Sequence, residues 1–297
     1  MAIQWFPGHM AKATRQISEK LKLIDIVLEV ADARLPHSSR NPMLDKIVRA
    51  KPRLILLNKE DLADPLITKK WLHHYREKGL EALAINAQTG KGISQIFDAC
   101  LRLVRENPNK SNLKIPSRPI RSLIVGIPNV GKSSLINRLA KRYAAKTGDR
   151  PGVTKGQQWI KTGNNLELLD TPGLLWPKID DPRAGLILAA SGAIKDEILP
   201  KEEVALFALG FLRSKYPELL KTRYNLKELD QDPFLLLDEI GRRRGCLKKG
   251  GEVDRERAAD LFLQELRTGM LGPVSFEEPE ERTRPDHTEG GIEAPTT

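Results

Sequence analysis

The sequence predicts an α/β fold with a mostly parallel sheet, followed by a smaller all-α domain. Two observations lead to this prediction. Between residues 23 and 170, short apolar runs alternate with segments of helical period, an order typical of a parallel sheet with crossover helices. After Trp176 the periodic segments are helical only.

The individual elements follow from the same pattern. Apolar runs predict strands at residues 24–30, 53–57, 82–85, 122–127, 157–162 and 166–169. One helix is expected to begin at Asn41-Pro42, because a cap residue precedes a proline there and proline suits the first helical position. The other helices are predicted at about 65–78, 92–106, 132–143, 201–216, 233–243 and 254–269.

The chain divides into four parts by composition. They are a basic N-terminal segment (1–22), an α/β domain (23–177), a helical domain (178–271) and an acidic tail (272–297). The tail is expected to be disordered, because it is rich in Pro, Gly and Thr and poor in apolar residues. Residues 107–119 contain three prolines and no periodicity, which predicts a surface linker.

The charge is unevenly distributed along the chain. Of the net charge of +10, residues 1–177 contribute a surplus, with 30 Lys/Arg against 15 Asp/Glu. Such a surplus points to a polyanionic partner, although charge that serves solubility accounts for part of it. No apolar run reaches the length of a membrane span, and the N-terminus resembles no signal or transit peptide. We therefore expect a cytoplasmic protein without a membrane partner.

Cysteine and histidine usage excludes a common metal site. The two cysteines and five scattered histidines do not have the spacing of a zinc finger. Cys100 lies at core spacing in the helix predicted over 92–106, so we interpret it as a core residue rather than a reactive thiol.

The segment Gly126-Ile-Pro-Asn-Val-Gly-Lys-Ser133 matches the P-loop pattern between a predicted strand and a predicted helix, which is the context that this motif requires. Backbone amides of such a loop face phosphates, the lysine neutralises β and γ oxygens, and the serine hydroxyl binds Mg²⁺. The nucleotide-binding residues predicted here are Asn129, Val130, Gly131, Lys132, Ser133 and Ser134.

Two further positions are predicted to act on the phosphates and on Mg²⁺. Asp170-Thr-Pro-Gly173 follows an apolar strand, so Asp170 would emerge at a strand end and hold Mg²⁺ through water, while Gly173 would offer its amide to the γ-phosphate. Thr154 lies in the preceding loop, where its hydroxyl suits Mg²⁺. Each of these features is an ordinary turn or loop residue in isolation, and the upstream P-loop favours the functional interpretation.

A base-recognition site is predicted at the segment Asn58-Lys-Glu-Asp61, which follows an apolar run. The Asp61 carboxylate can accept both the N1 and N2 hydrogens of guanine, a pair that adenine lacks, and paired hydrogen bonds discriminate strongly. Lys59 would lie along the base and Asn58 would tie the loop to the P-loop; a helix cap after a strand is the alternative. Asn86 and Ala87 follow the next strand and would contact the guanine carbonyl oxygen, although such loops usually begin with serine.

Together these motifs resemble P-loop GTPases of the translational-factor class, with the base motif placed before the P-loop, so the fold resembles a circular permutation. Three features of the whole chain are similar to the YlqF family of ribosome-assembly GTPases: Trp5-Phe-Pro-Gly-His-Met-Ala-Lys12, the permuted order, and the last helix with Asp260-Leu-Phe-Leu and Arg267-Thr-Gly-Met-Leu-Gly272. The resemblance implies a monomeric enzyme that binds GTP and GDP, hydrolyses GTP, and acts in late assembly of the large ribosomal subunit.

The resemblance also suggests which residues take part in catalysis. Leu174 stands where Ras-like enzymes place a water-orienting glutamine, and leucine cannot hydrogen-bond water. His9 would take that role, together with Lys132 and Gly173 in the catalytic set; capping a helix or touching RNA is the alternative for His9. Asn129 resembles the asparagine by which some GTPases bind K⁺, and a loop-closing hydrogen bond is its alternative role.

Two basic clusters are candidates for contact with ribosomal RNA, chiefly through phosphates. Runs of this kind are also common as solvated surface. The residues are Lys12, Arg15, Arg242, Arg243, Arg244, Lys248 and Lys249.

Three other functions remain open at this point. A switch acting on protein partners would not need the positive surplus. A small-subunit assembly GTPase would carry a zinc module or an N-terminal OB domain, and a P-loop ATPase is disfavoured by Asp61.

Overall fold

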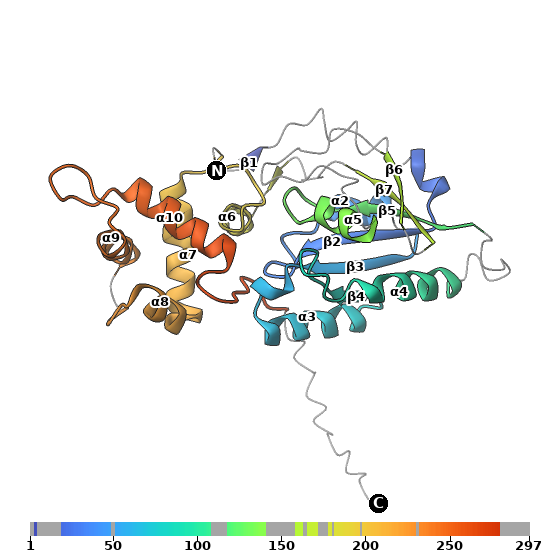
Figure 1. Ribbon diagram of the computed structural model, residues 1–297, viewed down its shortest axis with the longest axis horizontal. Coiled ribbons are helices and arrows are strands. Elements are labelled where there is room, and N and C mark those ends of the chain that lie inside the picture. Colours follow the sequence, from blue (N-terminus) through green and yellow to red (C-terminus); the bar gives the residue numbers. More distant parts are fainter. Residues whose placement is uncertain are drawn as a thin grey trace, which may run out of the picture.

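The computed structural model describes residues 3–4, 19–48, 51–107, 118–140, 158–162, 165–171, 178–179, 181–196, 198–229 and 232–279. A sheet flanked by helices lies beside a group of helices, α6 to α10 (Figure 1). The strands are β1 (Ile3–Gln4), β2 (Ile26–Asp32), β3 (Arg53–Asn58), β4 (Glu81–Ala84), β5 (Ile120–Val125), β6 (Gln158–Lys161), β7 (Leu166–Asp170) and β8 (Lys178–Ile179). The helices are α2 (Pro42–Ile47), α3 (Pro65–Glu77), α4 (Ser94–Arg105), α5 (Lys132–Ala140), α6 (Pro182–Ala190), α7 (Lys201–Lys215), α8 (Pro217–Tyr224), α9 (Pro233–Arg243) and α10 (Arg255–Thr268), with 3₁₀ turns η1 (Leu21–Leu23) and η2 (Glu60–Leu62).

The main sheet has six strands in the order β4-β3-β2-β5-β7-β6. All neighbours are parallel except β6 and β7, so the predicted mostly parallel α/β sheet is confirmed. Because parallel strands end at the same edge, the segments that follow β2, β3, β4, β5 and β7 converge there. This edge carries the base motif, the P-loop and Asp170.

Apolar side chains cover both faces of the sheet. On one face α3 packs through Ile67, Trp71 and Tyr75. On the other face α4 and α5 join a core that continues into the helical part. Cys100 belongs to this core and is fully buried, and burial raises the pKa of its thiol to about 12; the core interpretation is confirmed.

The helical part is organised around α7, which packs against α6, α8, α9 and α10. Glu265 of α10 ties two neighbouring segments together, because its carboxylate accepts hydrogen bonds from Arg223, Tyr224 and Arg244. Among the described residues, no helix has the length and apolar character that crossing a membrane requires.

Every strand predicted in the main sheet is present, with ends displaced by up to two residues. Helices α6 and α8 were not predicted. Helix α6 is almost wholly apolar and buried along most of its length, so it has no polar face to produce an amphipathic period. Helix α8 has only eight residues, too few for a clear period. The end predicted for α5, at 143, lies outside the described residues.

The prediction that only helices follow Trp176 was wrong. Strand β8 pairs antiparallel with β1 near the N-terminus, with Ile3 opposite Ile179. A two-residue strand produces no alternation in sequence, so this pairing between distant segments has no sequence signal.

The prediction that the tail is disordered from residue 272 onward was also wrong for the first part of the tail. Val274, Ser275 and Phe276 are buried, and we call residues 274–277 the C-terminal strap. Phe276 donates its amide to the Arg34 carbonyl, and the Glu277 carboxylate accepts from the amide of His37. Two apolar side chains, Val274 and Phe276, are enough to hold this acidic stretch against the core. The average composition of the tail does not reveal them. Residues 280–297 lie outside the described part.

Replacing Phe276 by Leu is expected to lower the free energy of unfolding by about 1–2 kcal/mol, because the ring packs within the core against Phe211 with ring centroids 5.1 Å apart. Urea unfolding measures the change as a shift in midpoint. Phe234→Leu is the matched control, since Phe234 is 46% exposed and its loss is expected to cost less than about 0.5 kcal/mol. Equal shifts for the two variants would refute the anchoring role of the strap.

Candidate nucleotide-binding site

The predicted P-loop connects β5 to α5 at the shared edge of the sheet. Two glycines shape it: Gly126 and Gly131 have φ of +156° and +98°. A Cβ at Gly126 would overlap the Val30 carbonyl, and one at Gly131 would overlap the Asn58 amide. The loop therefore passes close to two neighbouring strand ends, which only glycine allows.

Two buried charges lie at the site, Lys132 in the P-loop and Asp170 at the end of β7. The Lys132 ammonium donates to the carbonyls of Gly126 and Ile127, at 3.0 and 2.9 Å. Burial lowers the pKa of Lys132 to about 8, and the negative charge of Asp170 opposes that shift. Asp170 is fully buried at the end of β7. Such a buried cation, beside a helix N-terminus, suits a polyanion that supplies compensating charge.

The donor set at this edge fits Mg²⁺. Ser133 is the second residue of α5, directly after Lys132, and the buried carboxylate of Asp170 ends the neighbouring strand β7. A hydroxyl and a carboxylate are hard oxygen ligands of the kind that Mg²⁺ takes beside phosphates. When bound, Mg²⁺ would neutralise charge on the β and γ phosphate oxygens.

Asn58 joins three segments. Its side-chain nitrogen donates to the Val130 carbonyl at 2.8 Å, and its side-chain oxygen accepts from the Ala87 amide at 3.0 Å. The contact predicted between Asn58 and the P-loop is therefore present. Ala87 belongs to the loop predicted to contact the guanine carbonyl oxygen, and its amide donates to Asn58 in this structure.

The loop after β4 begins with Asn86 where serine is usual. The Asn86 side-chain oxygen accepts from the amides of Gln88 and Thr89, at 2.8 and 2.9 Å. An asparagine thus supplies the turn-forming acceptor that a hydroxyl would otherwise provide. The loop is therefore held by its own hydrogen bonds although asparagine replaces the usual serine.

The base loop, residues 58–61, lies beside two charges that sequence reasoning did not single out, Asp32 and Arg34 at the end of β2. Lys59, with φ of +59°, directs its ammonium to the carboxylate of Asp32 at 3.0 Å. Asp32 is also paired with the buried Arg34 at 2.8 Å. Asp61, the predicted reader of guanine, lies exposed in η2. The available signal was the charged segment Asp32-Ala-Arg34 directly after a buried apolar run.

The nucleotide site touches the helical part directly. The Asn129 side chain donates to the Gly192 carbonyl at 2.8 Å, in the turn that follows α6. Arg267 of α10 holds the same turn through the carbonyls of Ala189 and Ala190. The P-loop and the last helix therefore meet at one turn, which the sequence did not predict.

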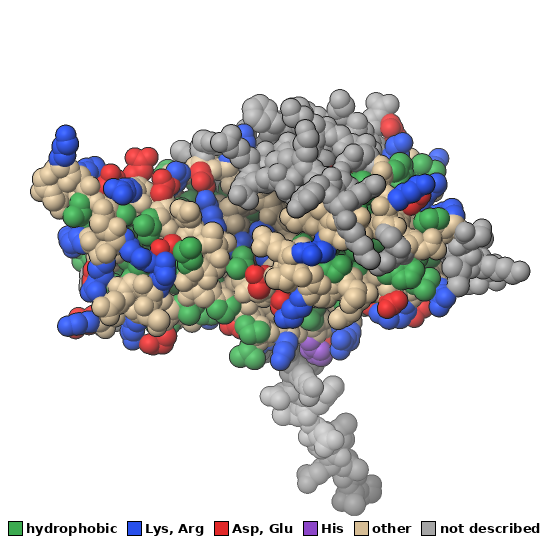
Figure 2. Space-filling model, in the orientation of Figure 1, with side chains coloured by type: hydrophobic (Ala, Val, Ile, Leu, Met, Phe, Trp, Pro, Cys, Tyr) green, Lys and Arg blue, Asp and Glu red, His purple; other side chains and the backbone are tan. Residues whose placement is uncertain are grey.

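The predicted RNA-binding cluster near residue 244 is divided by the structure. Arg243 pairs with Glu239, and Arg244 pairs with Glu265, whereas Lys248 and Lys249 are exposed. Figure 2 shows cationic side chains interspersed with acidic ones over the helical part. Part of the predicted cluster is thus engaged within the protein.

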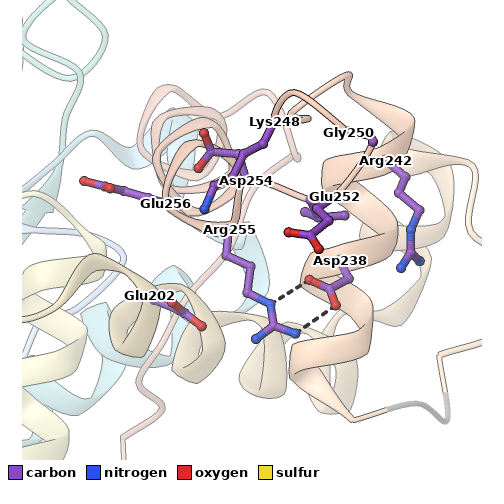
Figure 3. A pocket seen from close by; sticks show the side chains of 11 residues that line it. Glu202, Asp238, Arg242, Lys248, Gly250, Glu252, Asp254, Arg255 and Glu256 are labelled. Carbon is purple, nitrogen blue, oxygen red and sulfur yellow. Dashed lines mark hydrogen bonds and ion pairs between the residues drawn. The ribbon is translucent and has the colours of Figure 1, made fainter.

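A cavity of about 830 Å³ opens between α9 and the start of α10. Its lining contains five carboxylates against three cationic side chains, and Arg255 spans it to pair with Asp238 at 2.8 Å (Figure 3). The carboxylates outnumber the cations in this lining, and two of the cations, Arg242 and Lys248, belong to the predicted RNA-binding cluster.

Several predicted site residues lie outside the described part of the chain. They are His9, Lys12, Arg15, Thr154 and Gly173.

The fold and the site define a P-loop GTPase in which the base motif precedes the phosphate-binding loop. A model of the family described as 50S ribosome-binding GTPase matches residues 121–239. The chain is 58% identical to the ribosome biogenesis GTPase A of Priestia megaterium, over 96% of this chain and all of that protein. It is 37% identical to the Thermotoga maritima protein of the same name, over 95% and 96% of the two chains.

Solved structures agree with these relatives. The crystal structure of GNP-bound YlqF from T. maritima is similar with a TM-score of 0.63 and 32% identity, covering 91% of this chain and 99% of that one. The GDP-bound YlqF structure has a TM-score of 0.65 and 31% identity, covering 90% and 100%. The chain belongs to the ribosome biogenesis GTPase A, or YlqF, family of circularly permuted GTPases, and it is a GTP-hydrolysing assembly factor.

Proposed function

We propose that this protein binds the maturing large (50S) ribosomal subunit and uses GTP hydrolysis in a late step of its assembly. The observation that carries the proposal is the match to a family described as 50S ribosome-binding, in a chain related over its whole length to ribosome biogenesis GTPases. In this proposal the protein works as a monomer in the cytoplasm.

The contact between the P-loop and the helical part supports a coupled cycle. Asn129 reaches Gly192, and Arg267 fastens that turn to α10. Movement of the P-loop or of the segment after Asp170 on hydrolysis would therefore displace the helices that are proposed to face the ribosomal particle.

Within the site, each residue has a proposed task. Lys132 neutralises phosphate oxygens and Gly173 donates its amide to the γ-phosphate. The side-chain oxygen of Asn129 holds K⁺ while its nitrogen binds Gly192. The guanine base is bound by Lys59, Asp61 and the loop of Asn86 and Ala87, and Asn58 joins these segments to the P-loop. The phosphates are bound by the P-loop residues Asn129, Val130, Gly131, Lys132, Ser133 and Ser134, and Mg²⁺ by Ser133, Thr154 and Asp170.

His9 is proposed to orient the attacking water, because Leu174 offers no hydrogen-bonding group. Contacts to rRNA phosphates are proposed for Lys12, Arg15, Arg242, Arg243, Arg244, Lys248 and Lys249. The exposure of Lys248 and Lys249 suits this task, whereas Arg244 would have to share its guanidinium with Glu265.

GTP turnover in K⁺ buffer tests the proposal, measured for the protein alone and with isolated large or small subunits. Stimulation by large subunits only is expected. His9→Ala is expected to lower the stimulated rate at least about tenfold and to leave GDP affinity unchanged, because water positioning acts in the transition state.

His37→Ala is the matched control, since this exposed histidine donates its backbone amide, and not its imidazole, to the Glu277 carboxylate. Stimulation by small subunits, or by neither particle, would refute the large-subunit role and favour an assembly factor of the small subunit or a switch for protein partners. Stimulation that survives in His9→Ala would return His9 to a structural role.

A further inference from the structure

We propose that Asp32 is a positioning residue for the base loop, which holds Lys59 in place for the guanine base, and that Arg34 keeps Asp32 in the required orientation. The proposal rests on the assignment of Lys59 to the base site. It does not depend on the ribosomal partner.

Asp32 stands at the point where β2 ends beside the base loop. Its Cα partner in β3 is Asn58, and the amide of Ala33 donates to the Asn58 carbonyl at 2.8 Å. Asp32 is therefore adjacent across the sheet to Asn58, the residue that precedes Lys59. From there its carboxylate reaches the Lys59 ammonium at 3.0 Å.

Arg34 fixes the same carboxylate. Its guanidinium donates to both Asp32 oxygens, at 3.0 and 2.8 Å. The Arg34 residue is only 1% exposed and also donates to the Ser191 carbonyl at 3.3 Å. A guanidinium that forms two hydrogen bonds to a carboxylate restrains its orientation more than a single point charge does. Arg34 therefore fixes the orientation in which the Asp32 carboxylate meets Lys59.

The electrostatics agree with this geometry. Asp32 is buried, and the positive charges of Arg34 and Lys59 outweigh burial and hold the pKa of its carboxyl well below its ordinary value. Asp32 is thus ionised throughout the physiological range. An ion pair with one partner buried is screened less by salt than a surface pair.

The loop itself needs such a restraint. Lys59 adopts a left-handed backbone with φ of +59°, a conformation that is unfavourable for a non-glycine residue. Its side chain is 26% exposed, so without Asp32 a four-carbon stem would sample many rotamers. Ordering it on binding would then weaken nucleotide affinity.

The test is a set of variants titrated with a fluorescent GDP analogue, with kcat measured at saturating GTP. Asp32→Asn removes the negative charge that holds Lys59. This variant is expected to weaken GDP binding about tenfold and to change kcat less than twofold, because the position of the base affects nucleotide affinity and not the chemical step. Lys59→Ala is expected to weaken binding at least as much. In the Lys59→Ala background, Asp32→Asn should add nothing, because the two residues act through one contact.

Glu29→Gln is the matched control. Glu29 lies on the same strand, is equally buried and pairs with Arg40 at 2.9 Å, but it faces away from the base loop. Its loss should lower the urea midpoint as much as Asp32→Asn does and leave GDP affinity within twofold.

Each outcome decides between two assignments. Asp32→Asn with unchanged affinity, or with a further loss in the Lys59→Ala background, would overturn the proposal. Lys59→Ala with unchanged affinity would instead show that the base site is wrongly assigned. If Asp32→Asn does not fold, Arg34→Lys replaces it, because it keeps the charge and loses the two-bonded geometry; unchanged affinity in that variant would overturn the proposal too.

Discussion

Asp61→Asn is expected to move the preference of the protein from GTP to xanthosine triphosphate. In the proposed base site the Asp61 carboxylate accepts the N1 and N2 hydrogens of guanine, and an amide nitrogen in its place would face the N2 amine as a second donor. Sites built on paired hydrogen bonds lose about 10³-fold or more when one pair is mismatched. Xanthine carries an oxygen at that position, so the amide can donate to it.

Competition titrations with GTP, GDP and xanthosine triphosphate measure this switch. Glu60→Gln is the matched control, because Glu60 lies next to Asp61 in η2 and pairs with Lys91 at 2.9 Å. The Glu60→Gln variant should keep the preference for GTP. Unchanged GTP selectivity in Asp61→Asn would refute the guanine site.

Gly131→Ala is expected to lower nucleotide affinity about 100-fold. Gly131 has φ of +98°, and a Cβ there would overlap the Asn58 side-chain nitrogen. That nitrogen donates to the Val130 carbonyl, so the methyl group would separate the base loop from the P-loop. A displacement of about 1 Å in a binding group can cost this much.

Gly79→Ala separates backbone strain from the overlap. Gly79 has φ of +70°, but a Cβ there meets nothing within 4 Å, and it lies in the turn after α3. Both variants should lose about 1 kcal/mol of stability from the left-handed backbone. Only Gly131→Ala should lose GDP affinity; an equal effect in Gly79→Ala, or no loss in Gly131→Ala, would contradict the proposed role of the contact with Asn58.

The phosphate-binding loop was recognisable because its residues are consecutive. Backbone amides, Lys132 and Ser133 belong to one short segment between a strand and a helix, so the motif and its context are both local. The base motif was predictable for the same reason. That the two meet followed from the parallel order of strands, since carboxyl ends share an edge.

The sequence by itself determined the fold class, the position of the P-loop and the permuted order of motifs, because apolar period and short consecutive motifs are local properties. Only the tertiary structure decided which charges serve the base loop and which serve the core. Asp32 meets Lys59 across two strands, Arg34 reaches Ser191 from 157 residues away, and Phe276 returns to Arg34. Contacts between distant segments depend on the packing of the whole chain, and a buried ion pair is stable only where that packing places both partners together.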